Sequence, residues 1–107
     1  MTDLRIKKLE ESKNLISFEE ITTGIKVQVM KDTFINAVNK LKYWRENLDT
    51  PGFDSILYYL ISKADDRNKL KFFVGFPEET IAYILWYTAI NKKDFWGTWS
   101  KKWLLGL

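Results

Sequence analysis

The fold class is decided by residues 15–30, LISFEEITTGIKVQVM, where two short β-branched and aromatic runs flank a tight turn. In the second run Ile25, Val27 and Val29 alternate with polar side chains, as expected for a half-buried strand. Gly24 closes the intervening TTG and can adopt the left-handed conformation that a tight turn requires. We therefore predict a β-hairpin with strands at residues 15–21 and 25–30.

The spacing of apolar residues changes directly after this hairpin. From Lys31 to Leu48 apolar side chains recur every three to four residues, which is the period of a helix. Asp32 or Thr33 is the natural N-cap of this helix. The helix must end before Pro51, because the proline ring disfavours the helical conformation in the preceding residue.

The region between Pro51 and Pro77 is less clearly patterned. A second short helix is predicted at residues 54–64, and its run ILYYLI is apolar on every side, which is typical of a buried element; a strand is the alternative for so short a run. Residues 64–69, ADDRNK, are typical of a polar loop. Residues 70–74 fit a third strand that ends at Gly75.

The C-terminal part predicts two more helices. Pro77 opens the clearest helix of the chain, with two glutamates in its first turn and an end near Asn91. A last helical piece is expected at residues 94–105, interrupted by Gly97. The first residues, up to about Leu9, fit neither period and are interpreted as a short strand or a frayed helix.

Together these segments predict one α+β domain over residues 1–107, with residues 92–107 as a Lys/Trp-rich C-terminal helix. An N-terminal hairpin, or a small three-stranded sheet, packs on three to four helices. The predicted core has the Pro77 helix at its centre. Its members are Ile81, Leu85 and Trp86, packed against Phe34, Val38, Leu41, Val27 and Val29.

Composition excludes several classes of function. The 107 residues contain no Cys and no His, so disulfides, thiolate nucleophiles, imidazole metal ligands and histidine acid/base catalysis are ruled out. Hydrophobic residues make up 46% of the chain and aromatic residues 16%, which indicates a folded domain rather than a disordered one. We expect no cofactor and no catalytic residues.

Adjacent carboxylates were the remaining candidates for a metal or catalytic site. Glu78 and Glu79 are explained by helix initiation, since negative charge favours the positive end of the helix dipole. Asp65 and Asp66 sit in a predicted polar loop and resemble part of an oxygen-ligand Mg²⁺ site. One loop supplies no second set of ligands, so we favour a polar turn and expect no metal.

The formal surplus of basic charge lies near the C-terminus. The chain carries 17 Lys and Arg against 14 Asp and Glu, and the whole excess falls within the last 17 residues, where large aromatic side chains alternate with lysines. On a helix the tryptophans form one stripe, which either closes the core or binds a partner. The predicted partner-binding residues are Lys92, Lys93, Trp96, Trp99, Lys101, Lys102 and Trp103.

Three functions from different classes fit these observations. The leading hypothesis is a non-catalytic binding protein that docks on another protein, because its apolar and aromatic content exceeds what a small core needs. Its Lys/Asn/Ile-rich composition suits an inhibitor or adaptor carried by a phage or another mobile element. The alternative is a nucleic-acid-binding module that uses the C-terminal Lys/Trp segment. The third is a peripheral membrane protein that uses the same segment at a lipid interface.

The location and the oligomeric state are expectations of the same kind. The N-terminal MTDLRIKKLEESKN lacks the apolar stretch of a secretory signal, and the longest apolar stretch, residues 81–90, is too short to span a bilayer. We therefore expect a cytoplasmic protein without a transmembrane segment, and we assume a monomer.

Overall fold

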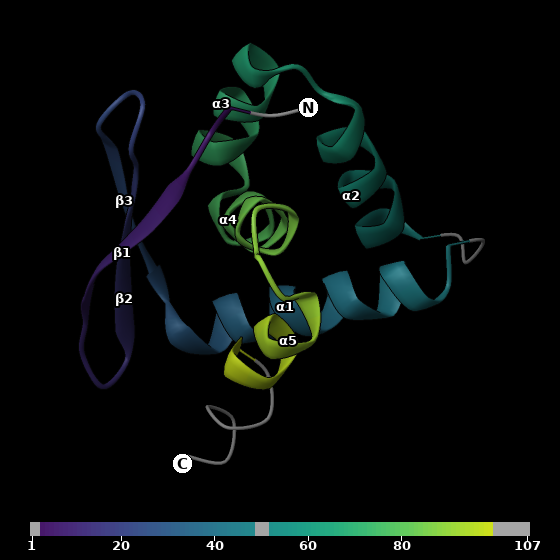
Figure 1. Cartoon of the computed structure of the whole chain (residues 1–107), viewed down its shortest axis with the longest axis horizontal. Helices are drawn as coiled ribbons and strands as arrows, with labels where there is room; N and C mark the ends of the chain where they lie inside the picture. The colour runs from purple at the N-terminus through teal and green to yellow at the C-terminus, as the bar shows by residue number, and fades with distance from the viewer. Residues whose placement is uncertain (1–2, 49–51, 100–107) are drawn as a thin grey trace.

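The N-terminal third of the chain forms a three-stranded antiparallel sheet in the computed structural model, which describes residues 3–48 and 52–99. Strands β1 (Ile6–Glu11), β2 (Leu15–Glu20) and β3 (Ile25–Met30) lie in the order β1-β2-β3 (Figure 1). The predicted hairpin is confirmed, and the first segment, left open between strand and helix, is a strand.

The turn between β2 and β3 is held by a buried carboxylate. Gly24 has a φ of 73°, and Glu20 pairs with Ile25 across the turn. The Glu20 carboxylate accepts hydrogen bonds from the amides of Arg5 (2.9 Å) and Thr23 (2.9 Å) and from the hydroxyls of Thr22 and Thr23. Burial by itself raises the pKa of Glu20, but these hydrogen bonds outweigh it and lower the pKa below its usual value. The carboxylate therefore fixes β1 and the turn in place.

Helix α1 (Lys31–Glu46) follows β3 without a loop and confirms the predicted helix, but its N-cap is Met30, without a side-chain hydrogen bond, and not Asp32 or Thr33 as predicted. Its buried side includes Phe34, Val38 and Leu41, all with no exposed surface. Because these residues recur at three-to-four spacing, they form one stripe that packs toward the molecular interior. In Figure 1 α1 lies below α2, α3 and α4.

Helices α2 (Phe53–Lys63) and α3 (Asp66–Gly75) form a helical hairpin. The prediction of a loop at residues 64–69 and a strand at residues 70–74 was wrong. Asp65 caps α3 by accepting a hydrogen bond from the amide of Asn68 (2.8 Å), so the polar stretch begins a helix. Phe73 is fully buried and Leu70 half-buried, which means that the apolar run is used at helical spacing.

Helix α4 (Pro77–Tyr87) runs through the centre of the molecule. Figure 1 looks along α4, with the sheet, α1, α2 and α3 arranged around it. It ends earlier than predicted, and the Thr88 hydroxyl donates a hydrogen bond to the carbonyl of Ile84 (2.7 Å). Ile81 is in the core as predicted, but Leu85 and Trp86 are only half-buried, because α4 is covered on every side at residues 80–84 and less so in its last turn.

The sheet contributes one face to the same core. Phe18 and Val29 are buried, whereas Val27, predicted to be buried with Val29, is half-buried closer to the turn at Gly24. Helix α5 (Lys92–Trp99) covers α1 and buries Phe95. The remainder of the predicted C-terminal helix, residues 100–105, lies outside the described residues. Within residues 3–48 and 52–99, no helix has the length and apolar composition needed to cross a membrane.

The chain is therefore a single compact α+β domain, as predicted, and its described residues form a three-stranded sheet followed by five helices rather than three to four. The additional helix is α3, at the position where a strand was expected.

Candidate functional site

Helix α2 exposes a stripe of large apolar side chains. Leu57, Tyr58 and Ile61 face the core, whereas Phe53, Ile56 and Leu60 are 67%, 58% and 48% exposed. The exposed residues have the spacing i, i+3, i+7, so they lie along one face of the helix. The prediction that α2 is buried on all sides was wrong, because α1, α3 and α4 cover only its inner face.

A groove of about 530 Å³ lies between α2 and α3 beside this stripe. Its apolar walls are Leu60 from α2 and Phe72 and Phe76 from the end of α3. The Phe76 ring lies 6.4 Å from the Phe72 ring and 6.2 Å from the Phe53 ring, which joins the groove to the exposed stripe. We call the groove and stripe together the α2–α3 surface; its residues are Phe53, Ile56, Leu60, Lys63, Ala64, Asn68, Lys71, Phe72, Gly75 and Phe76.

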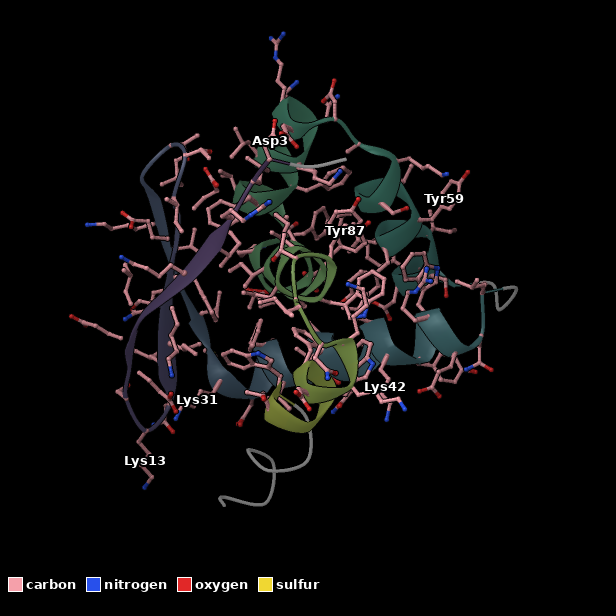
Figure 2. The ribbon with its side chains drawn as sticks, in the orientation of Figure 1. Asp3, Lys13, Lys31, Lys42, Tyr59 and Tyr87 are labelled. Carbon is pink, nitrogen blue, oxygen red and sulfur yellow. The ribbon has the colours of Figure 1, made fainter. Side chains whose placement is uncertain are left out.

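The charges that line the groove are positive. Lys63 and Lys71 are both exposed, and no carboxylate is among the lining residues. The ammonium of Lys63 lies over the Tyr59 ring at 5.7 Å, and Figure 2 shows Tyr59 pointing away from the body of the molecule. Among the described residues neither lysine of the groove forms an ion pair, so both can meet an anionic group.

The inner face of α2 is fixed by a buried tyrosine. The Tyr58 hydroxyl donates a hydrogen bond to the carbonyl of Ala37 in α1 (2.6 Å), and its ring stacks on Trp44 at 5.9 Å. Burial, assisted by the negative charges of Glu79 and Asp54, strongly raises the pKa of Tyr58, so the hydroxyl stays protonated and remains a donor. These contacts hold α2, which forms one wall of the groove, against α1.

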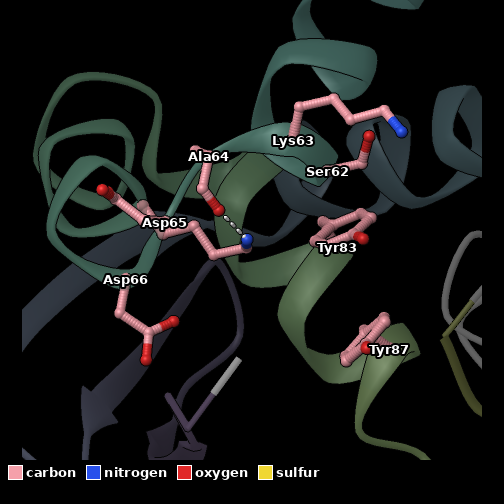
Figure 3. Close-up of a pocket in the computed structure, with 8 residues that line it drawn as sticks. Ser62, Lys63, Ala64, Asp65, Asp66, Tyr83 and Tyr87 are labelled. Carbon is pink, nitrogen blue, oxygen red and sulfur yellow. Dashed lines mark hydrogen bonds between the residues drawn. The ribbon is translucent and has the colours of Figure 1, made fainter. Parts of the chain in front are cut away.

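A second cavity, of about 450 Å³, lies at the junction of α2, α3 and α4 (Figure 3). The buried ammonium of Lys69 donates a hydrogen bond to the carbonyl of Ala64, where α2 ends. Burial lowers the pKa of Lys69, an effect that Asp66 and Asp65 partly oppose. Tyr83 and Tyr87 form the opposite wall, with their rings stacked at 5.8 Å.

The two aspartates of this cavity have structural partners. Asp65 caps α3, and Asp66 accepts a hydrogen bond from the amide of Asp3 (3.0 Å), which ties the N-terminal segment to α3. No cluster of three or more His, Cys, Asp or Glu side chains suited to a metal occurs in the part of the chain that the structure describes. The residues weighed as Mg²⁺ ligands are thus used to begin a helix and to anchor the first strand.

The lysines predicted to bind a partner differ in their surroundings. Lys92 donates hydrogen bonds to the carbonyls of Trp86 and Tyr87, both at 3.2 Å, at the end of α4. Its ammonium also lies over the Trp86 ring at 5.0 Å. Lys93 is exposed at the start of α5. Lys101 and Lys102 lie outside the described residues.

The tryptophans of α5 contact the core. Trp96 stacks on Trp86 at 6.4 Å, and Trp99 meets the Phe34 ring edge-on at 5.3 Å and lies 6.2 Å from the Phe18 ring. Both are partly buried against the core, and Trp103 lies outside the described residues. These contacts dock α5 onto α1 and the sheet. A role of Trp96, Trp99 and Trp103 in partner binding stays a prediction.

The α2–α3 surface was not identified from the sequence, although one signal was present. Residues 56–61 are apolar at six successive positions, whereas a helix packed on one side can bury only part of its circumference. Comparison with protein-family models, curated proteins and solved structures finds no match to this chain.

Proposed function

We propose that the chain is a non-catalytic binding protein that docks on another protein through its α2–α3 surface. The observation that carries the proposal is the continuity of exposed Phe53, Ile56 and Leu60 with an apolar groove. Large contiguous apolar patches on a small domain mark interaction sites, and aromatic side chains are enriched in the centre of protein interfaces. A cytoplasmic adaptor or inhibitor that works as a monomer is the form we propose.

The roles of the ionisable groups support binding over catalysis. Asp65, Asp66 and Lys69, which line the polar cavity, are each engaged in holding a helix end or the N-terminal segment. General acid/base catalysis needs a group that faces a substrate with a suitably tuned pKa. The α2–α3 surface, in contrast, offers apolar area flanked by two lysines. Such a surface suits a protein interface better than a site for proton transfer.

A nucleic-acid partner is the alternative from the sequence. It relies on stacking by the C-terminal tryptophans and on phosphate contacts by neighbouring lysines. In the described part of that segment the rings of Trp96 and Trp99 are already packed against other aromatic rings, and Lys92 bonds to backbone carbonyls. These contacts favour a protein partner, and the test below distinguishes it from a nucleic-acid partner.

The test uses two matched variants. Ile56→Glu places a charge on the α2–α3 surface, and Ile21→Glu places the same charge at an equally exposed isoleucine in the β2–β3 turn. The sheet and α2 lie on opposite sides of the molecule (Figure 1). Tagged wild type and both variants are used to capture partners from nuclease-treated and untreated lysate of cells that encode the chain, followed by quantitative mass spectrometry.

We expect wild type and Ile21→Glu to retain the same protein, and Ile56→Glu to lose it by tenfold or more, with or without nuclease. A charge buried at the centre of an interface costs several kcal/mol, so a tenfold loss is a lower bound. Retention that depends on nucleic acid, disappears in high salt and is unaffected by Ile56→Glu would overturn the proposal in favour of the C-terminal segment.

A further inference from the structure

We propose that the α2–α3 groove accepts an amphipathic helix of the partner whose carboxylates lie over Lys63 and Lys71. This inference rests on the proposed function, because it names the class of partner for the same surface. It commits to one occupant, an apolar-faced and acidic helix, rather than to an extended peptide, a membrane or a second copy of the chain.

The geometry of α2 and α3 favours a helix as occupant. The two helices are joined only by Ala64 and Asp65, and the Phe53 ring at the start of α2 lies 6.2 Å from the Phe76 ring at the end of α3, so the helices run antiparallel with the groove between them. A third helix fits such a groove because ridges of side chains on one helix pack into the grooves of others. The exposed stripe along α2 continues the same apolar surface, which suits partner side chains at i, i+3 or i+4, and i+7.

Small residues at the groove allow close approach of the partner backbone. Ala64 lines one end of the groove and Gly75 the other. A Cβ atom built on Gly75 would meet no atom within 4 Å, so this space is open to a ligand and is not filled by the chain itself. The larger walls, Leu60, Phe72 and Phe76, remain free to enclose apolar anchors of the partner.

The charge along the groove is uneven, and this gives the partner an orientation. Lys63 and Lys71 line the groove, whereas Asp54 and Glu78, in the first turns of α2 and α4, follow Phe53 and Phe76 by one and two residues in the sequence. Asp54 is paired with Lys40 at 3.2 Å, so its charge is compensated. An incoming helix is therefore complementary when its Asp and Glu residues cover the lysines and its other end is neutral or basic.

The same features disfavour two other occupants. A second copy would present the same lysine-flanked surface, so the two surfaces would carry like charges. An anionic membrane would satisfy the lysines and the exposed stripe of α2, but a lipid surface would not fill the groove of about 530 Å³ between α2 and α3.

The first experiment selects ligands without assuming their form. A display library of random 16-residue peptides is selected against the wild-type protein, with Ile56→Glu used for counter-selection. Enriched sequences should combine apolar residues at helical spacing with Asp and Glu clustered toward one end. Their circular dichroism should gain helical signal on binding, after subtraction of the protein.

The second experiment measures the role of charge. The double variant Lys63→Glu, Lys71→Glu is compared with Lys13→Glu, Lys26→Glu, which changes the net charge equally at exposed lysines on the sheet side, opposite α2 (Figure 1). Lys13 lies at the tip of the sheet, far from α2 (Figure 2). In fluorescence anisotropy an enriched acidic peptide should bind the first double variant about tenfold more weakly and the second within twofold of wild type. A Lys-for-Glu version of the peptide should show the opposite preference.

The outcomes separate this inference from the proposed function. Some enriched peptides could depend on Ile56 and yet be extended, be basic, or be unaffected by the lysine exchange. Such peptides would refute the inference of an acidic helical partner but would still support docking of a protein at the α2–α3 surface. A selection that enriches no Ile56-dependent peptide would overturn both.

Two further arms test the other occupants. Ile56-dependent binding to phosphatidylserine-containing vesicles would show that the α2–α3 surface binds a membrane and would refute the helical partner. An Ile56-dependent dimer in analytical ultracentrifugation would show that it binds a second copy of the chain. We expect neither.

Discussion

Neighbouring residues of α2 should differ sharply in their contribution to stability, because they lie on opposite faces of the helix. Leu57 is 4% exposed and Ile56 is 58% exposed. Leu57→Ala removes buried methyl groups and leaves a cavity, which costs about 2 to 5 kcal/mol. Ile56→Ala removes groups that are less than half buried and leaves no cavity, and the better helix propensity of Ala offsets part of the loss. We expect a cost of about 1 kcal/mol or less for Ile56→Ala.

Urea denaturation of the two variants measures this difference. With a dependence on urea of roughly 1.5 kcal/mol per molar, Leu57→Ala should lower the unfolding midpoint by about 1 to 3 M, and Ile56→Ala by less than about 0.7 M. The slope of the transition should be unchanged in both variants. Equal losses of 2 kcal/mol or more would show that α2 is buried on both sides, which would refute the exposed stripe and the surface built on it.

Three other predictions concern the turn, the last described helix and the cap of α3. Glu20→Gln should cost about 1 to 3 kcal/mol at pH 7, because an amide cannot accept all the hydrogen bonds made by the carboxylate. Folding lowers the pKa of Glu20 below 4.5, so the wild type is more stable than Glu20→Gln above that pH, and this difference in the free energy of unfolding is lost as the pH falls through the folded-state pKa. Urea denaturation of both proteins between pH 7 and 3 measures the difference, and a difference independent of pH would contradict the prediction. Trp99→Ala should cost about 2 kcal/mol in the same assay through lost packing on Phe34, whereas an unchanged stability with lost partner capture would assign Trp99 to the interface. Asp65→Ala should cost about 1 kcal/mol as a lost cap, and Mg²⁺ should not raise the melting temperature of the wild type; a saturable rise absent from this variant would reopen the metal site.

The sequence predicted the elements whose local pattern and tertiary packing agree. The hairpin around Gly24 and the helix from Lys31 were predicted correctly, because turn chemistry and apolar period gave the same answer there. The strand predicted at residues 70–74 failed because those apolar residues are equally compatible with a helix. The capping of α3 by Asp65 and the burial of Phe73 decide between them, and only the packed structure shows both.

The candidate site was harder to predict for a related reason. An apolar run on a helix indicates burial only when other elements cover every face, and the number of covering elements is a tertiary property. Here α2 lies at the edge of the helical layer, so four of its seven large apolar residues face outward. The Lys/Trp pattern near the C-terminus predicts a binding segment instead, although Trp96 and Trp99 make the contacts that dock α5 on the core.

The measurement that tests the central claim most directly is a map of the bound surface by NMR. A ¹⁵N-labelled sample is titrated with the captured partner or with an enriched peptide, and shifts of backbone amides and tryptophan indole N–H groups are followed. We expect the largest changes at Leu60, Lys71, Phe72 and Phe76, with the indole signals of Trp96 and Trp99 unmoved. Large changes confined to those indoles and to α5, with α2 and α3 unaffected, would contradict it.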